Sequence, residues 1–144
     1  MEPHNYSIKL DWKNNRNGVL HAQDLNEKLT VATPPPFPKG EAGTWSPEHL
    51  LTAAVSSCLM TTFLAIAENS NLQFIAFSCD AEGTLDKVEG KLKMSKILVK
   101  PVVRITYEKD RDRAMRILQK AEAACLITNS ITAEVIMEVT IEVD

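Results

Sequence analysis

The longest run of hydrophobic positions in the chain lies at residues 46–68 and shows no polar face. Leucine, alanine, valine, phenylalanine and isoleucine occur on every side of a helix drawn through this run, with small serine and threonine residues between them. Ser46 can accept a hydrogen bond from a backbone N–H as the N-cap, and Pro47 suits the first helical position. Because a helix that is apolar on all sides is typically buried, residues 46–68 are predicted to form a central core helix. Its charged residues and many hydroxyls argue against a membrane span.

Most of the remaining chain alternates between apolar and polar residues, which is typical of strands with one buried face. Residues 6–32 are predicted to form a three-stranded meander that turns at Asn17-Gly18, with Arg16 at its tip. Further along, Pro101 marks a bulge or an edge, since proline lacks a ladder donor. The other predicted elements are a proline-rich loop at 33–45, two long strands within 72–107, a second, amphipathic helix at 110–124 and a C-terminal strand at 132–143.

The order of these elements predicts the fold class. Strands occur in runs and do not alternate with helices, which is typical of an α+β protein with largely antiparallel sheet. A chain of 144 residues fits one domain, spanning 1–144. Six or so strands would cover the first helix on one face only, so we expect a homodimer that covers it from the other side.

Composition narrows the possible partners. The net charge is −3 and basic residues are interleaved with acids, so we expect no nucleic-acid partner. The start of the chain lacks the basic and apolar run of a signal peptide, which favours the cytoplasm. Three widely spaced cysteines match neither a disulfide framework nor a zinc pattern. In a reducing compartment such cysteines are either packing residues or redox groups.

Each residue that could carry chemistry also has a structural interpretation. A cysteine inside a helix is usually packing, an arginine in a turn is usually solvated, and a glutamate in the first turn of a helix offsets the macrodipole. A histidine in the same turn is either a proton carrier or a plain surface residue. The candidates are Cys58, Cys125, Arg16, Glu48 and His49. Cys79, on the apolar face of a strand, is expected to be core packing.

Two stretches of the chain resemble the OsmC/Ohr family, the osmotically inducible protein C and organic hydroperoxide resistance proteins. One is Ser46-Pro47-Glu48-His49-Leu50-Leu51 with Ser57-Cys58, and the other is Ala123-Ala124-Cys125-Leu126-Ile127-Thr128-Asn129-Ser130. The resemblance implies an OsmC-like fold, with antiparallel sheets wrapped around a long buried helix plus a second helix in an intertwined homodimer. It also implies thiol-dependent reduction of peroxides, chiefly organic hydroperoxides.

Carried over residue by residue, the resemblance implies that Cys58 is the peroxidatic cysteine, Cys125 the resolving cysteine and Glu48 the family's carboxylate. Arg16-Asn17-Gly18 resembles the turn that supplies the activating arginine, and Lys39 is the one cation of the proline-rich loop that could substitute. Cys58 would pass through a sulfenic acid to a disulfide with Cys125. An external dithiol such as a dihydrolipoyl group would then reset the enzyme without a bound cofactor.

This chemistry sets a geometric requirement, because a buried thiol needs a cation to become a thiolate. Arg16 could supply it, with Glu48 fixing the guanidinium by a bidentate pair. Ten residues along an ideal helix leave Glu48 roughly 80° off the face of Cys58 and ~15 Å away along the axis. We therefore expect the site to be assembled at the dimer interface or across a kink. Leu126 is a departure, since the family usually has proline directly after the second cysteine.

A second hypothesis from a different class stays open at this point. The same fold could hold a lipid-like ligand in an apolar interface pocket lined by Phe37, Trp45 and helix residues, with the cysteines as packing only. No arrangement of cysteine, histidine and asparagine or aspartate around Cys58 suggests a thiol hydrolase.

Overall fold

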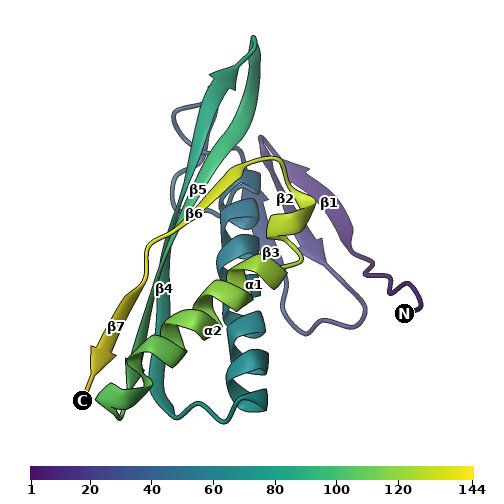
Figure 1. The fold of residues 1–144 in the computed structure, drawn as a ribbon. Helices are drawn as coiled ribbons and strands as arrows, with labels where there is room; N and C mark the ends of the chain where they lie inside the picture. Colours follow the sequence, from purple (N-terminus) through teal and green to yellow (C-terminus); the bar gives the residue numbers. More distant parts are fainter. The chain divides into compact units, whose positions relative to one another are not determined.

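The computed structural model describes all residues, which fall into two compact units, Met1–Leu50 and Leu51–Asp144. Each unit has its own β-sheet (Figure 1). The long helix α1, Pro47–Asn69, begins in the last residues of the first unit and continues in the second. The predicted α+β class with two α-helices is confirmed. The expectation of a single domain stays a prediction.

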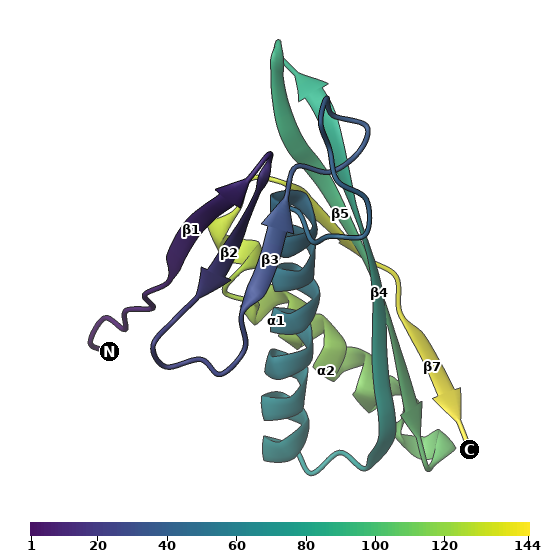
Figure 2. The ribbon, with the colours of Figure 1, turned by 180° about the vertical axis from the view of Figure 1, so that it is seen from behind.

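The first unit holds an antiparallel sheet in the order β1-β2-β3, whose three strands are labelled in Figure 2. Its strands are β1 Lys9–Asn14, β2 Asn17–His21 and β3 Leu29–Ala32. Arg16 lies at the tip of the β1–β2 hairpin as predicted, but the turn uses Asn15, with φ of 44°, and the prediction of an Asn17-Gly18 turn was wrong. Gly18 instead allows β1 and β2 to approach each other closely, because a Cβ on this residue would lie 2.8 Å from the Asp11 carbonyl oxygen.

The start of α1 is fixed by a reciprocal cap between Ser46 and His49. Ser46 is fully buried, and its Oγ accepts the backbone N–H of His49 at 3.1 Å. In return the His49 Nδ1 accepts the Ser46 backbone N–H at 3.2 Å and lies 2.7 Å from the Ser46 Oγ. This is the capping-box arrangement with histidine in the position usually held by glutamate or glutamine. The predicted N-cap at Ser46 and first helical position at Pro47 are thus confirmed.

The second unit is built on the long antiparallel hairpin β4–β5, with two short strands added to the other edge of β5 (Figure 1). These short strands pair with β5 in parallel and replace the one C-terminal strand predicted. The elements after α1 are β4 Phe74–Val88, β5 Lys91–Ile105, the 3-10 turn η1 Glu108–Asp110, α2 Arg111–Ala124, the 3-10 turn η2 Thr128–Ser130, β6 Glu134–Met137 and β7 Thr140–Val143.

Pro101 explains why the C-terminal segment is split. Strand β6 pairs with β5 as far as Val99, and β7 resumes the pairing at Val102, so Pro101 lies in the interval between them. A proline has no N–H to donate to a neighbouring strand there. Pro101 lies on the central strand of the sheet, at neither a bulge nor an edge. The prediction that Pro101 marks a bulge or an edge was therefore wrong.

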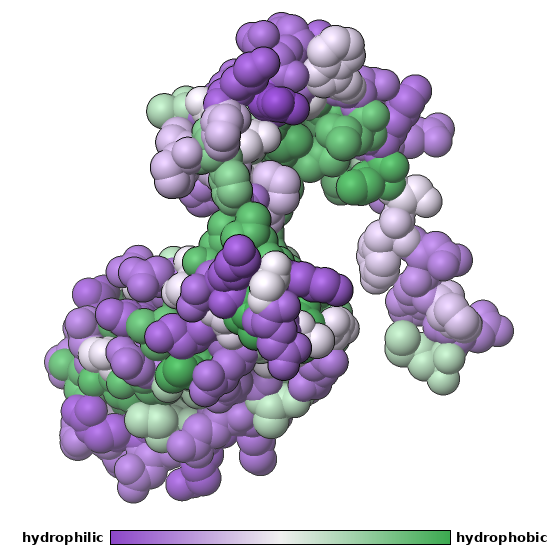
Figure 3. All heavy atoms as spheres, turned by 90° about the horizontal axis from the view of Figure 1, so that it is seen from above, coloured by the Kyte–Doolittle hydropathy of each residue, from purple (hydrophilic) through white to green (hydrophobic).

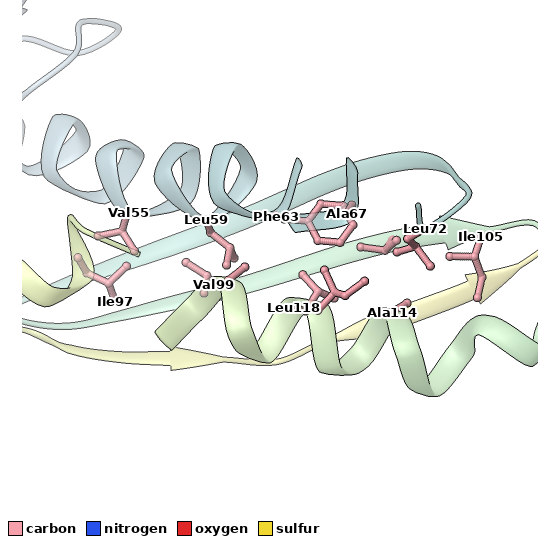
Figure 4. Close-up of a cluster of buried hydrophobic side chains, with 13 residues drawn as sticks. Val55, Leu59, Phe63, Ala67, Leu72, Ile97, Val99, Ile105, Ala114 and Leu118 are labelled. Atoms are coloured by element: carbon pink, nitrogen blue, oxygen red, sulfur yellow. The ribbon is translucent and has the colours of Figure 1, made fainter. Parts of the chain in front are cut away.

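The core of the second unit is a three-sided contact between α1, β5 and α2. Every fourth residue of α1, namely Val55, Leu59, Phe63 and Ala67, points toward the strand and the other helix (Figure 4). The Phe63 ring packs against the rings of Phe74 and Phe77, with centroids 5.3 and 5.1 Å apart. The residues facing this stripe are Ile97, Val99, Val103 and Ile105 of β5 and Ala114, Ile117, Leu118 and Ala121 of α2.

The remaining sides of α1 are only partly covered within one chain. Its buried residues are the four of the stripe and Cys58, whereas Met60 and Leu64 are 38% and 39% exposed. Apolar side chains accordingly reach the molecular surface (Figure 3). By length and composition alone α1 could cross a membrane, but the core helices of soluble proteins pass the same test. The prediction that α1 does not span a membrane rests on its charged residues and hydroxyls, and in the structure the helix shares a core with α2 and β5.

Truncating Phe63 to alanine should lower the free energy of unfolding by about 3–5 kcal/mol, because a fully buried ring is removed and a cavity remains. Leu92→Ala is the matched control, since Leu92 is 63% exposed at the β4–β5 turn and its loss should change stability by less than about 0.5 kcal/mol. Urea unfolding at one fixed protein concentration measures both. Equal losses in the two variants would contradict the core described here.

Candidate active site

The second unit brings Cys58 and Cys125 into contact. Cys58 lies in the middle of α1 and Cys125 directly follows α2. Both thiols are reduced, and they are close enough for each to shift the pKa of the other. Both side chains are buried, Cys58 being 8% exposed and Cys125 1%. When one of two neighbouring thiols is oxidised to a sulfenic acid, the other thiol can condense with it to form a disulfide. This is the chemistry of a peroxidatic and resolving pair.

The end of α2 is built to present Cys125. The helix stops at Ala124, and Cys125 takes an extended conformation with φ of −64° and ψ of 109°, which turns the chain away from the helix axis. The side chain of Asn129 donates to the Ala123 carbonyl at 3.2 Å, and its backbone N–H donates to the Cys125 carbonyl at 3.0 Å. Asn129 therefore holds the segment that follows α2 against the C-terminal end of that helix.

The environment of Cys58 favours its thiolate. Burial raises the pKa of the Cys58 thiol, but hydrogen bonds from the Cys125 thiol, the Ile127 N–H, the Thr62 hydroxyl and the Leu126 N–H outweigh it. The Thr62 Oγ1 lies 3.9 Å from the Cys58 Sγ, one turn further along α1. The resulting pKa lies below that of an ordinary cysteine. Because the thiolate is the nucleophilic form, Cys58 is the more reactive of the two thiols.

Cys125 shows the opposite balance. Burial raises the pKa of its thiol, hydrogen bonds from the Thr128 hydroxyl and N–H lower it, and the neighbouring Cys58 raises it again. The pKa of Cys125 therefore lies above its usual value, and this thiol stays protonated where Cys58 has ionised. A thiol that stays protonated beside a thiolate can react afterwards with a sulfenic acid formed on the thiolate sulfur.

Cys79 is placed where packing accounts for it. It lies half-buried on β4, packs against the core, and its Sγ is 3.5 Å from the Asp80 carbonyl oxygen. Burial raises the pKa of the Cys79 thiol, so it has none of the activation seen at Cys58.

Arg16, Glu48 and His49 belong to the first unit. Arg16 is exposed at the hairpin tip, where its carbonyl accepts the Thr33 N–H at 3.2 Å. Glu48 is half-buried in the first turn of α1. The His49 side chain accepts the Ser46 N–H in the cap of α1, which is a structural role for this residue. The roles of Arg16 and Glu48 at Cys58, and the substitution of Arg16 by Lys39, stay predictions.

A pocket of about 540 Å³ in the first unit is lined by apolar residues, by Arg16 and by the polar residues Asn15, Asn17 and Thr33. Its apolar side chains come from β1 and β3 and include Leu10, Trp12 and Val31. Phe37 does not line it, and Trp45 lines a smaller hollow with His49. The expectation of an apolar interface pocket lined by Phe37, Trp45 and helix residues stays a prediction. No three histidine, cysteine, aspartate or glutamate side chains group as a metal site.

The sequence analysis missed the groups that hold the two thiols. Thr62 follows Cys58 by four residues, so helical periodicity places its hydroxyl on the same face and could have identified it. Leu126 and Ile127 act through backbone N–H groups, which carry no sequence signal. Leu126 in particular uses a donor that proline at this position would lack.

Comparison with known proteins shows the family and the fold of this chain. The family model described as OsmC-like protein matches residues 40–140. YmaD of Bacillus subtilis (strain 168), an uncharacterized protein, is 27% identical over 138 residues, 94% of this chain and 91% of that protein. VCA0330 of Vibrio cholerae, an OsmC-like protein of unknown function, has a TM-score of 0.86 at 25% identity, covering 95% of this chain and 99% of the other.

Two further solved structures share the fold. An organic hydroperoxide resistance protein OsmC from Legionella pneumophila has a TM-score of 0.75 at 21% identity, covering 97% of this chain and 99% of the other. The organic hydroperoxide resistance protein OhrB of Bacillus subtilis has a TM-score of 0.64 at 20% identity, covering 95% and 98%. The resemblance inferred from the sequence is thereby confirmed at the level of family and fold.

The two pKa directions predict the order in which the thiols react with iodoacetamide as pH rises. Cys58 should reach half its maximal rate below the pH needed by a cysteine in an unfolded peptide, because its pKa is lowered. Cys125 and Cys79 should reach it above that pH, because burial raises their pKa values. Mass spectrometry of the alkylated peptides reads each site separately. Identical profiles for Cys58 and Cys79 would show that Cys58 is not activated.

Proposed function

We propose that this chain, which belongs to the OsmC-like protein family, is a thiol-dependent peroxidase that reduces organic hydroperoxides. The observation that carries the proposal is the contact between two buried thiols of which one has a lowered pKa and the other a raised pKa. Two solved relatives are named as organic hydroperoxide resistance proteins, which supports the choice of substrate class.

In the first step the Cys58 thiolate attacks the distal oxygen of the hydroperoxide. The O–O bond breaks, the alkoxide leaves and takes up a proton to give the alcohol, and Cys58 becomes a sulfenic acid. The lowered pKa of Cys58 supplies the thiolate, and burial of the site keeps water away from the sulfenic acid. The peroxide is thus reduced by two electrons taken from the sulfur.

In the second step the Cys125 sulfur bonds to the Cys58 sulfur and the sulfenic oxygen leaves as water. The thiols need little movement, because they are already in contact in the reduced protein. An external dithiol, for which we propose a dihydrolipoyl group, then exchanges with the disulfide. It restores both protein thiols and is itself oxidised to a disulfide.

We assign Arg16 as the activating cation and Glu48 as its carboxylate partner, as the family resemblance implies. We place the reaction in the cytoplasm, as a defence against oxidative stress. A homodimer is part of this proposal, because Met60 and Leu64 leave apolar surface on α1 that a second copy would cover.

A second candidate function rests on the pocket of the first unit. Its 540 Å³ volume, apolar lining and single arginine suit an amphiphile with an anionic head. In that case the protein would be a non-catalytic binding protein for a lipid-like molecule, and the thiols would survive contact with peroxides.

Consumption of cumene hydroperoxide, with dihydrolipoamide as reductant, distinguishes the two functions. We expect turnover by the wild type, loss of it in Cys58→Ser, and a fall of roughly 10²-fold or more in Arg16→Ala if the arginine activates the thiolate. Cys79→Ser is the matched control and should keep full turnover, since burial leaves the pKa of the Cys79 thiol raised.

Thiol counting gives an independent readout of the same reaction. One equivalent of hydroperoxide without reductant should remove two thiols per chain in the wild type and in Cys79→Ser, and Cys58→Ser should form no Cys58–Cys125 disulfide. Survival of all three thiols would overturn the peroxidase and favour the binding protein.

Sedimentation equilibrium tests the homodimer. We expect a mass of two 16.0 kDa chains for the wild type, and a shift toward one chain in Leu64→Asp, because a charge would be buried in the interface. Leu64→Met keeps the surface apolar and should stay dimeric. A wild-type mass of one chain would contradict the proposal.

A further inference from the structure

We propose that Thr62 is a positioning residue for the reactive sulfur, because its hydroxyl holds the Cys58 side chain by a hydrogen bond that is strongest when the sulfur is a thiolate. The bond itself is independent of enzymatic activity. Its effect on turnover rests on the proposed peroxidase function.

The geometry of α1 brings the two side chains together. The Thr62 Oγ1 lies 3.9 Å from the Cys58 Sγ, within one turn of the same helix. Every Cα–Cβ bond of a helix tilts toward the N-terminus, so the Thr62 side chain leans back over the turn that holds Cys58. Thr62 is half-buried and Cys58 is buried, so the contact is largely shielded from water.

Neighbouring hydroxyl groups of α1 take a different partner. The Ser57 Oγ donates to the Ala53 carbonyl at 2.7 Å, and the Thr61 Oγ1 donates to the Cys58 carbonyl at 3.1 Å. Serine and threonine inside helices commonly donate to such a carbonyl three or four residues earlier. Thr62 departs from this pattern, because the hydrogen-bond partner of its hydroxyl is a sulfur.

The bond made by Thr61 explains the difference. The carbonyl that Thr62 would ordinarily use belongs to Cys58, four residues earlier. A carbonyl oxygen has two lone pairs, and this one accepts the helical N–H of Thr62 and the hydroxyl of Thr61. The backbone acceptor is therefore occupied, and the Thr62 hydroxyl is left for the sulfur.

The direction of the bond depends on the protonation of Cys58. Either side chain can donate while Cys58 is a thiol, but only the Thr62 hydroxyl can donate to a thiolate. A hydrogen bond to the ionised form favours that form, and the same hydroxyl is one of the groups that lower the pKa of the Cys58 thiol. Threonine is β-branched and stiff at χ1, so the donor stays in place.

Thr62→Val removes the hydroxyl and keeps the shape of the side chain, whereas Thr62→Ser keeps the hydroxyl. Ser57→Ala is the matched control, because it removes a hydroxyl that donates to the backbone beside Cys58. The pH profile of Cys58 alkylation by iodoacetamide should have its midpoint raised by up to about one unit in Thr62→Val. Thr62→Ser and Ser57→Ala should match the wild type. Cys125, the titratable group beside Cys58, is the same in all four proteins.

The rates distinguish a lost hydrogen bond from a change in access to the sulfur. A midpoint raised by about one unit lowers the thiolate fraction about tenfold below both midpoints, but makes each thiolate about threefold more nucleophilic. Alkylation of Thr62→Val should therefore be about threefold slower than wild type below both midpoints and about threefold faster above both. Equal midpoints, or one uniform change in rate across the pH range, would overturn the proposal.

A second variant guards against failure of Thr62→Val to fold. Thr62→Ala removes the same hydroxyl and introduces a residue of higher helix propensity. Its midpoint should rise in the same way, and an unchanged midpoint would contradict the proposal.

Peroxide turnover, measured in parallel, separates this inference from the proposed function. A wild type without turnover whose Cys58 profile still depends on the Thr62 hydroxyl would refute the peroxidase and retain the role of Thr62. A wild type with turnover whose profile is unchanged in Thr62→Val would do the reverse.

Discussion

The contact of the α1 stripe with β5 and α2 is the interaction on which the rest of the second unit depends. Val55, Leu59 and Phe63 recur every fourth residue, so they form one line of contact along the helix. Cys58 precedes Leu59 and is carried into the same contact, where the end of α2 brings Cys125 to it. The hydrophobic core and the reactive pair are therefore one structure, and loosening the core would also separate the thiols.

The two cysteines differ in acidity because of what surrounds them. Burial raises the pKa of both thiols, but Cys58 receives donors from Thr62, Leu126 and Ile127 in addition to Cys125. In a buried site, donors that are already in place stabilise an anion without the reorganisation that water would require. The asymmetry makes Cys58 the more nucleophilic thiol, in keeping with the peroxidatic role that we propose for it and the resolving role that we propose for Cys125.

Secondary structure was largely readable from the sequence, and the exceptions have physical reasons. Both α-helices and the long β4–β5 hairpin lie within a few residues of their predicted ranges, because local periodicity and capping residues decide them. The hairpin turn at Asn15 was missed because Gly18 is required by a neighbouring strand and not by a turn. The break between β6 and β7 depends on Pro101, a residue of another strand.

The sequence by itself determined the family, the identity of the candidate thiols and the elements that carry them, since each is a property of residues close together in the chain. Only the tertiary structure decided that Cys58 and Cys125 lie close together, because 67 residues and the elements β4, β5, η1 and α2 separate them in the chain. It also decided which thiol is the more acidic, since the donors include backbone N–H groups whose direction follows from the turn after α2 and from no side chain.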